Sequence, residues 1–266
     1  MPVYLDGVNL EDLGVRVSRD YQHPAAPETR DYTMEIPGRH GAWDFGADLG
    51  PRRIELPCFV VKNTPADVQR TIRALMAHLY DVYGRPKTVR LVFDTEPDKY
   101  YMARISGGLP VERIYRVGRF TLPFVAFDPF AYSVATNDEV VWGSEVITFE
   151  ADYLMGHTGG QVQTVTSPQS YVVTVMGYAI RPTILVNGSG SNVAISANGK
   201  SFSLGSFSNA NWVIDGDNYT VTRDGRNALS EFSGDFLELL PGENTVTVSG
   251  SSLNLTIQVK FRDKYL

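Results

Sequence analysis

Three carboxylates in the C-terminal part of the chain are the residues best suited to acid–base chemistry. Glu231, Asp235 and Glu238 stand close together in sequence, and a pair of carboxylates can act as general acid and base in glycoside hydrolysis. They also lie beside a turn, where acidic side chains normally face solvent. We therefore keep a cell-wall hydrolase as a minor alternative and predict that the protein is not an enzyme.

Other residues that bind metals or act as nucleophiles are scattered along the chain. Cys58 is the single cysteine, and its apolar neighbours predict a buried thiol rather than a reactive one. None of the histidines has ligand-type residues around it at metal-binding spacing. The four are His23, His40, His78 and His157.

One acidic turn has a weak likeness to a calcium loop. A loop of the EF-hand type that starts at Asp215 would place Tyr219 and Arg226 at ligand positions, and neither side chain can serve there. The sequence also contains no phosphate-binding loop, zinc-protease motif or nucleophile elbow. We therefore predict no catalytic residue, no metal site and no bound cofactor.

Aromatic side chains offer a different kind of surface. Trp43 and Phe45 lie in a segment punctuated by glycines, residues 39–46, and we predict that they contact another subunit. Trp142, Trp212 and Tyr219 are candidates for a sugar-stacking or docking surface, although aromatic residues of a β-sandwich more often belong to its core. A carbohydrate-binding module is therefore an alternative function, and its mark would be two coplanar aromatic rings that face solvent.

Charge divides the chain near residue 134. Residues 1–133 carry 17 basic and 17 acidic residues, whereas residues 134–266 carry 7 basic and 13 acidic ones. An acidic second half argues against nucleic acid or an anionic membrane surface as the partner. The first ten residues lack the features of a secretory signal, and the lone cysteine rules out an internal disulfide, so we expect synthesis and assembly in a reducing cytoplasm.

The first half has one clear helix among several strands. Thr64 is typical of an N-cap and Pro65 of a first helical position, and Gly84 is expected to follow the helix end. The apolar residues between them recur at helical spacing, which predicts a helix packed on a sheet. These residues are Val68, Ile72, Leu75, Met76 and Leu79. One helix among about eight strands predicts an α+β barrel or sandwich.

The second half has no helical period and is rich in glycine, serine, threonine and asparagine. Ten short strand candidates alternate with turn dipeptides, which predicts a β-sandwich of jelly-roll type. The dipeptides are Asn187-Gly188, Asn198-Gly199, Asp215-Gly216, Asp224-Gly225 and Pro241-Gly242. The predicted fold class is thus mostly β with one α-helix, in two domains: an α+β domain over residues 1–133 and a β-sandwich over residues 134–266.

The boundary between these domains follows a strand rich in phenylalanine, residues 118–133. The strand pattern stops at Asp128-Pro129. Pro129 has no N–H for a strand ladder and favours an extended or turn conformation at Asp128. This segment is therefore predicted to be the last strand of the first domain and its exit.

Several segments, in order along nearly the whole chain, resemble the distal tail protein (Dit) family of long-tailed, siphovirus-type bacteriophages. In the first half the similar segments are residues 4–14, the Ile36-Pro-Gly-Arg-His-Gly-Ala-Trp-Asp-Phe-Gly46 run, the strand–helix unit of residues 52–83, and residues 120–133. In the second half they are residues 224–228, 236–246 and 255–266. Each is weak alone, and their order and spacing carry the resemblance.

The resemblance implies a structural hub rather than an enzyme. It implies a homo-hexameric ring built by the N-terminal domain, with hairpins and loops exchanged between neighbours, at the tail tip of the virion. The C-terminal domain would be galectin-like or similar to a carbohydrate-binding module, and would dock receptor-binding or baseplate proteins. Further partners implied are the tail tube protein, the tail-tip (tail-associated) protein and the tape measure protein. The compact second half makes direct adhesion to host sugars a weaker expectation.

Overall fold

The computed structural model describes residues 2–141, 153 and 159–266, and in it the chain divides into two compact units. Unit 1 comprises residues 1–131 with Leu266, and unit 2 comprises residues 132–265. The predicted fold class, mostly β with one α-helix, is confirmed. Among the described residues, no helix has the length and apolar character needed to span a membrane.

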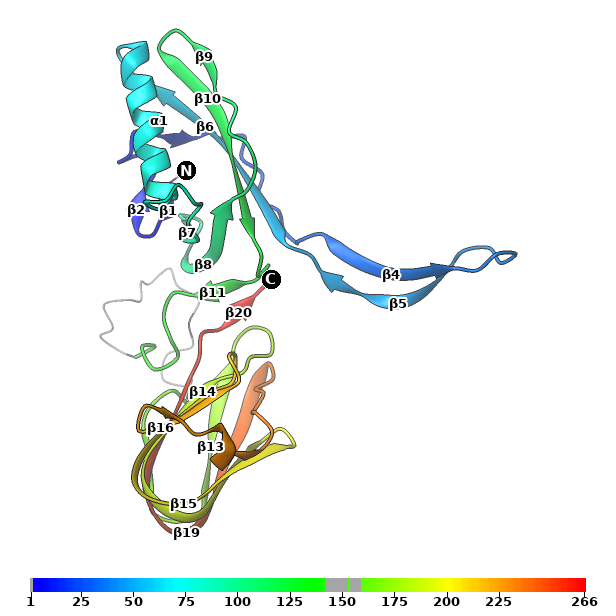
Figure 1. The fold of residues 1–266 in the computed structure, drawn as a ribbon, viewed down its shortest axis with the longest axis vertical. Coiled ribbons are helices and arrows are strands. Elements are labelled where there is room, and N and C mark those ends of the chain that lie inside the picture. Colours follow the sequence, from blue (N-terminus) through cyan, green and yellow to red (C-terminus); the bar gives the residue numbers. More distant parts are fainter. Residues whose placement is uncertain (1, 142–152, 154–158) are drawn as a thin grey trace. The chain divides into compact units, whose positions relative to one another are not determined.

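Unit 1 is built on a curled antiparallel sheet whose neighbouring strands follow the order β2-β1-β7-β8-β10-β6-β3, with β9 beside β10 (Figure 1). The bounds are β1 Val3–Leu5, β2 Val8–Asn9, β3 Arg16–Val17, β6 Arg52–Val61, β7 Val89–Phe93, β8 Glu96–Ile105, β9 Glu112–Ile114 and β10 Val117–Ala126. Strands β6 and β10 pair over ten residues, from Val61 opposite Val117 to Arg52 opposite Ala126. Alternate residues of β6 are buried, so one face of this sheet forms the core of the unit.

Helix α1 (Pro65–Leu79) covers the inner face of β6 and β10. As predicted, Thr64 is the N-cap, and its side chain accepts a hydrogen bond from the Asp67 N–H. Gly118 of β10 lets the helix come close, because a Cβ there would lie 3.0 Å from Cγ1 of Val68. The helix therefore owes its position both to its apolar stripe and to a missing side chain on the sheet.

Two boundaries in unit 1 differ from the prediction. The helix ends at Leu79, earlier than Gly84 suggested, because the side chain of Asp81 accepts hydrogen bonds from the N–H groups of Tyr83 and Arg85 and forms a turn instead. The sequence predicts residues 94–99 as the turn between two strands, but strand β8 already begins at Glu96, so the β7–β8 turn is only two residues long.

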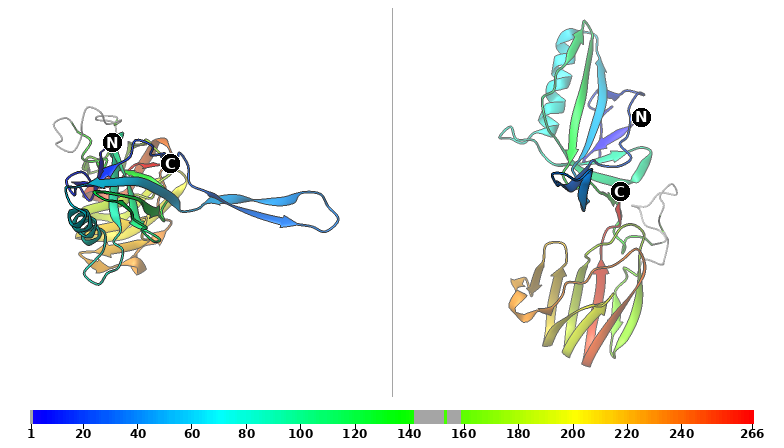
Figure 2. Two further views of the ribbon diagram at one scale, coloured as in Figure 1. Left: turned by 90° about the horizontal axis from the view of Figure 1, so that it is seen from above. Right: turned by 90° about the vertical axis from the view of Figure 1, so that its right-hand side faces the viewer.

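A long hairpin, here called the arm (residues 29–49), leaves the body of unit 1 (Figures 1 and 2). It consists of β4 (Thr29–Glu35) and β5 (Ala42–Leu49), which pair only with each other. The glycine-punctuated segment 39–46 was predicted as a loop or hairpin, and it forms the tip and half of the second strand. Every residue of both strands is exposed.

Unit 2 is a single curled sheet in the order β12-β19-β14-β15-β16-β17, with β13 beside β19 and β18 beside β15. Its elements are β12 Gln163–Val165, β13 Gln169–Val175, β14 Thr183–Ala197, β15 Lys200–Asp215, β16 Thr220–Arg223, β17 Arg226–Asn227, the 3-10 helix η1 Leu229–Glu231, β18 Ser233–Gly234, β19 Gly242–Lys260 and β20 Lys264–Tyr265. Strand β11 (Ala131–Ser133) begins at the last residue of unit 1. The inward residues of the three long strands β14, β15 and β19 enclose one apolar core.

In the described part of unit 2, three strands are much longer than the short ones predicted: β14, β15 and β19. Asn187-Gly188 is not a turn: it lies inside β14, where the register with β15 and β19 shifts between residues 188 and 194. These β-bulges bend the strand without ending it. The ten strand candidates in the sequence include residues 236–239, of which only Leu239 forms a bridge, to Ile180. They also include residues 140–142 and 146–149, which lie partly and wholly outside the described residues.

A candidate assembly surface

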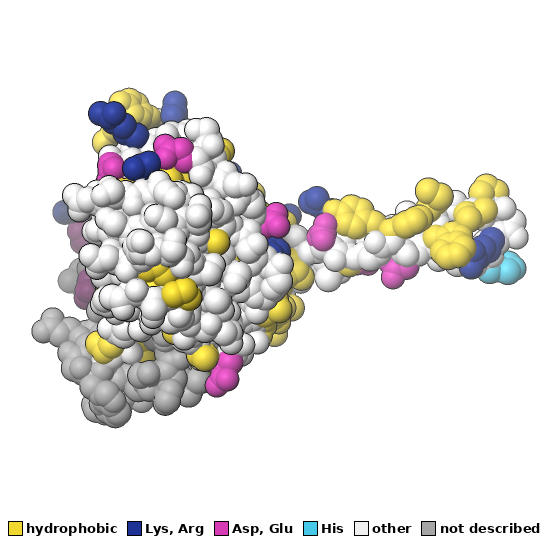
Figure 3. Space-filling model, turned by 90° about the horizontal axis from the view of Figure 1, so that it is seen from below, with side chains coloured by type: hydrophobic (Ala, Val, Ile, Leu, Met, Phe, Trp, Pro, Cys, Tyr) yellow, Lys and Arg dark blue, Asp and Glu magenta, His cyan; other side chains and the backbone are white. Residues whose placement is uncertain are grey.

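The arm separates its side chains onto two faces. Met34 lies directly opposite Trp43, and the residues two positions away, Tyr32 and Phe45, point to the same side of the ribbon. All four side chains are between 44% and 67% exposed. Figure 3 shows hydrophobic side chains along the length of the arm. We call Tyr32, Met34, Trp43 and Phe45 the apolar arm face.

The opposite face of the arm is acidic. Thr33 lies opposite Asp44, and Glu35 and Asp31 stand two positions to either side of Thr33. A bulge at Gly46, whose φ is +96°, inserts one extra residue into β5 between the pairs Thr33–Asp44 and Asp31–Ala47. One side of the arm is thus suited to burial and the other to water.

Local contacts keep the apolar arm face in place without covering it. The Arg39 guanidinium lies 4.3 Å from the centre of the Trp43 ring, a cation–π contact at the tip of the arm. Nearer the root, the Tyr32 hydroxyl donates a hydrogen bond of 3.0 Å to Asp48. A hairpin of two strands is marginally stable in water without further packing. The arm therefore has the surface of a half-buried sheet and nothing in unit 1 that buries it.

The root of the arm is held by Arg52, a residue that the sequence reasoning missed. Arg52 is the first residue of β6 and is 1% exposed. Its Nε donates to the carbonyl of Pro129 at 2.9 Å and its Nη1 to the carbonyl of Pro24 at 2.7 Å. The guanidinium carbon lies 5.2 Å from the centre of the Tyr101 ring. One side chain thus ties the segment that leads into β4 to the segment that follows β10.

Aromatic residues surround this arginine. Tyr21 Oη and His23 Nδ1 lie 2.7 Å apart, and His23 packs edge-on against Phe93. Burial, with the charge of Arg52, lowers the pKa of His23, so its ring is neutral at pH 7. The sequence contains a signal for Arg52, because this residue takes a buried position in the alternation of β6. It contains no signal for the contacts of His23 or for the carbonyls that Arg52 binds.

The aromatic candidates described in unit 2 are less exposed, or more closely packed against other side chains, than those on the arm. Trp212, a candidate for that surface, takes the alternative position in the core: it is 1% exposed and packs edge-on against Phe207. Tyr219 is half-exposed, but its ring meets Phe236 at 86° and lies under Arg181. Trp142 falls outside the described residues. The described part of unit 2 therefore does not bring these candidates together as a sugar-stacking platform.

Two of the three carboxylate candidates form ion pairs. Glu231 lies 2.7 Å from Arg223, and Glu238 lies 2.8 Å from Lys200. The hydrogen bond from Lys200 outweighs the effect of burial and lowers the pKa of Glu238, which suits a permanent anion rather than a general acid. Asp235 is exposed. Among the described residues, no group of three or more histidine, cysteine or acidic side chains is placed to hold a metal ion.

Cys58 is buried as predicted, and burial raises the pKa of its thiol to about 12. It is therefore protonated and unreactive at neutral pH.

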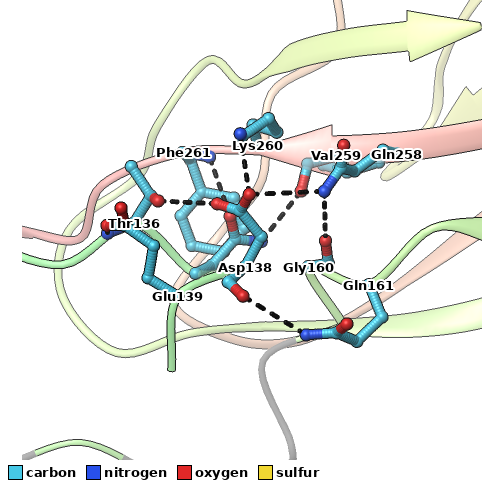
Figure 4. A network of polar contacts seen from close by, with 10 residues as sticks. Thr136, Asp138, Glu139, Gly160, Gln161, Gln258, Val259, Lys260 and Phe261 are labelled. Atoms are coloured by element: carbon cyan, nitrogen blue, oxygen red, sulfur yellow. Dashed lines mark hydrogen bonds and ion pairs between the residues drawn. The ribbon is translucent and has the colours of Figure 1, made fainter. Parts of the chain in front are cut away.

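A second polar cluster, which sequence reasoning did not find, lies in unit 2. There Asp138 accepts hydrogen bonds from Lys260 at 2.7 Å and from Thr136 at 2.6 Å (Figure 4). Gln258 donates to the carbonyl of Gly160 at 3.0 Å. This cluster fastens two segments to the end of β19.

The exposed arm, with its apolar face, is the described surface best suited to contact another molecule, as expected of a structural subunit of an assembly. Comparison with known proteins agrees with this class. Residues 8–126 match the family model described as phage tail protein RIFT-related domain, and residues 163–265 match siphovirus-type tail component, C-terminal domain. The chain belongs to the distal tail protein family of siphovirus-type phages.

The fold is shared with a solved structure. The crystal structure of the Dit protein of phage SPP1 has 19% sequence identity and a TM-score of 0.72, with 100% of this chain and 99% of that chain covered. A structure of the phage p2 baseplate in its activated conformation with strontium has 10% identity and a TM-score of 0.43, over 100% and 98% of the two chains. A search of curated proteins found no match.

Proposed function

We propose that the protein is the hub of a phage tail tip or baseplate, where six copies form a ring between the tail tube and the tail-tip apparatus. Its family supports this role, and the SPP1 Dit structure is described as a paradigm of a hub adsorption apparatus in phages that infect Gram-positive bacteria. The role is structural rather than enzymatic. The hub would be assembled in the host cytoplasm and reside at the tail tip of the virion.

Each domain has its own task in this proposal. The domain of residues 1–133 builds the ring and contacts the tail tube protein, the tail-tip protein and the end of the tape measure protein. The acidic domain of residues 134–266 docks receptor-binding or baseplate proteins. The division of the chain into units 1–131 and 132–265 supports such a separation of tasks.

The observation that carries the proposal is the apolar arm face. Trp43 is 48% exposed and Phe45 67% exposed. An aromatic side chain buries about 150–250 Å² when covered, so roughly half to two thirds of that area is left for a partner. At about 25 cal/mol per Å² this corresponds to ~2–4 kcal/mol for each ring before the costs of association. A neighbouring subunit that covers both rings would gain enough to make ring formation depend on them.

The test is the oligomeric state of the Trp43→Ala/Phe45→Ala double variant. We expect light scattering and negative-stain microscopy to show six-fold rings for the wild type, and association weakened by ~100-fold or more for the variant. Circular dichroism of the two should agree, because the rings are exposed in the subunit. Tyr83→Ala removes an aromatic ring that is 81% exposed elsewhere in unit 1 and is the matched control. Unchanged rings in the double variant would refute the role of the arm.

A further inference from the structure

A second apolar surface of unit 1 lies at the turn between β9 and β10. Val117 is opposite both Val61 on β6 and Ile114 on β9, so the three side chains form a row across three strands on the face away from the core. Val61 is 59% exposed and Ile114 55% exposed. We call Val61, Ile114, Tyr115 and Val117 the turn patch. It continues into a groove of about 830 Å³ lined by Pro57, Phe59 and Pro110, among others.

Tyr115 occupies an unfavourable backbone conformation at the edge of this patch. Its φ is +52°, in the left-handed region that glycine and asparagine adopt more readily. Its ring is 71% exposed, and the Arg116 guanidinium lies 5.1 Å from the ring centre. This conformation belongs to the two-residue turn that joins Ile114 to Val117, because such hairpin turns require a positive φ at their first central residue. The turn holds the Tyr115 ring in solvent, where it adds apolar area to the turn patch.

The charges around the turn patch are opposite to those of the arm. Residues 112–119 carry three arginines and one glutamate, and Lys62 follows Val61 directly. Residues 29–49, the arm, carry four carboxylates and two arginines. Opposite net charges on two apolar surfaces favour their encounter and disfavour the pairing of either surface with itself.

The two surfaces also lie at opposite ends of the same strand. The arm ends at Leu49, just before β6 begins at Arg52, and β6 ends at Val61 in the turn patch. Figure 1 shows the arm and β9 at the two ends of β6. Two complementary surfaces so placed on one chain produce head-to-tail association, which closes into a ring when the rotation permits.

We propose that the arm of one copy docks, through its apolar face, on the turn patch of the next copy. This inference rests on the proposed ring and adds the surface on which the arm docks, which we call the seat of the arm. The occupant is a second copy of this chain because the arm and the turn patch match in apolar character and in charge, and because Tyr32, Met34, Trp43 and Phe45 have no cover in their own unit.

Cysteine cross-linking tests the seat directly, since the native Cys58 is buried and does not react. The full-length variants Phe45→Cys and Ile114→Cys are each purified, mixed and oxidised. We expect a covalent dimer from the mixture, and from the Phe45→Cys/Ile114→Cys double variant a ladder that ends in a closed ring. Val82→Cys is the control, because Val82 is 93% exposed in unit 1 outside both surfaces.

The outcomes separate this seat from the proposed function. Wild-type rings without a disulfide between the Phe45→Cys and Ile114→Cys variants would overturn the seat and leave the ring intact, and equal cross-linking to the Val82→Cys control would overturn it as well. Wild-type protein that stays monomeric would overturn both. As a second measurement, Arg113→Glu/Arg116→Glu should weaken association by ~10-fold at low salt and reverse its salt dependence. Association that is insensitive to both changes would contradict the charge complementarity.

Discussion

Replacing Arg52 should loosen the root of the arm and destabilise unit 1. Arg52→Met keeps the length and the apolar stem of the side chain and removes the guanidinium. The carbonyls of Pro24 and Pro129, which now accept hydrogen bonds of 2.7 and 2.9 Å, then lose their donor. Both segments are irregular, so neither has a strand ladder that could replace the lost bonds.

Two opposing effects set the magnitude. A hydrogen bond from a charged donor contributes about 1.5–3 kcal/mol, so the two bonds amount to roughly 3–6 kcal/mol. Removing a buried charge returns part of this, because the guanidinium gives up its hydration in the folded state. Arg52 forms no ion pair within the described residues. We expect a net loss of about 2 kcal/mol, which lowers the melting temperature of a domain of this size by roughly 6–10 °C.

Thermal unfolding followed by circular dichroism measures the loss of stability of unit 1. Limited proteolysis of the segment before Thr29 measures the loosening of the arm root. Arg53→Met is the matched control, because Arg53 is the next residue of β6 and is exposed. The control should unfold like the wild type and resist the protease equally. Equal melting temperatures for Arg52→Met and Arg53→Met, with equal cleavage at the arm root, would refute the anchoring role of Arg52.

Two further changes test the packing of unit 1 and the polar cluster of unit 2. Gly118→Ala places a Cβ 3.0 Å from Cγ1 of Val68 and should destabilise unit 1 by ~1 kcal/mol in urea unfolding, whereas Gly108→Ala, with open space around it, should not; equal stability of the two variants would contradict the close approach of the helix. Burial alone would raise the pKa of Asp138, but the hydrogen bonds from Lys260 and Thr136 outweigh it and hold the pKa below its ordinary value of 3.8. The ionised form is thus stabilised by folding, and its contribution is present above pH 3.8 and is lost as the pH falls below it. Asp138→Asn should be less stable than the wild type at pH 7, with a gap that narrows towards pH 3; a gap independent of pH would exclude the ionic contribution.

Local signals predicted the elements whose causes are local. The N-cap at Thr64 and the apolar stripe of α1 depend on neighbours within one or two turns, and both are as predicted. The end of the helix depends instead on the side chain of Asp81 and on a bridge between Tyr80 and Pro86. Likewise, the bulges that carry β14 past Asn187-Gly188 depend on both neighbouring strands. A turn dipeptide indicates that the chain can bend, but the partner strands decide whether it leaves the sheet.

The tryptophans show why exposure was harder to predict than strand structure. Trp43 and Trp212 both occupy alternating strand segments, yet Trp43 is half-exposed and Trp212 is in the core. The difference lies in what faces them: β15 belongs to a curled sheet that encloses its inner face, whereas the arm has only two strands. Residue type gives the preference for burial, and the topology determines whether burial occurs within the chain.

The arm is the segment where local sequence and subunit structure disagree. Its apolar residues alternate as in a strand with one buried face, and in unit 1 that face meets water. Natural sequences keep such conflicts where function requires them. The apolar arm face contributes little to the stability of its own subunit, so under the proposed function we expect its contribution to come from contacts with a partner. A partner that covers this face would also stabilise a hairpin that is only marginally stable alone. The ordering of the arm would then be coupled to assembly.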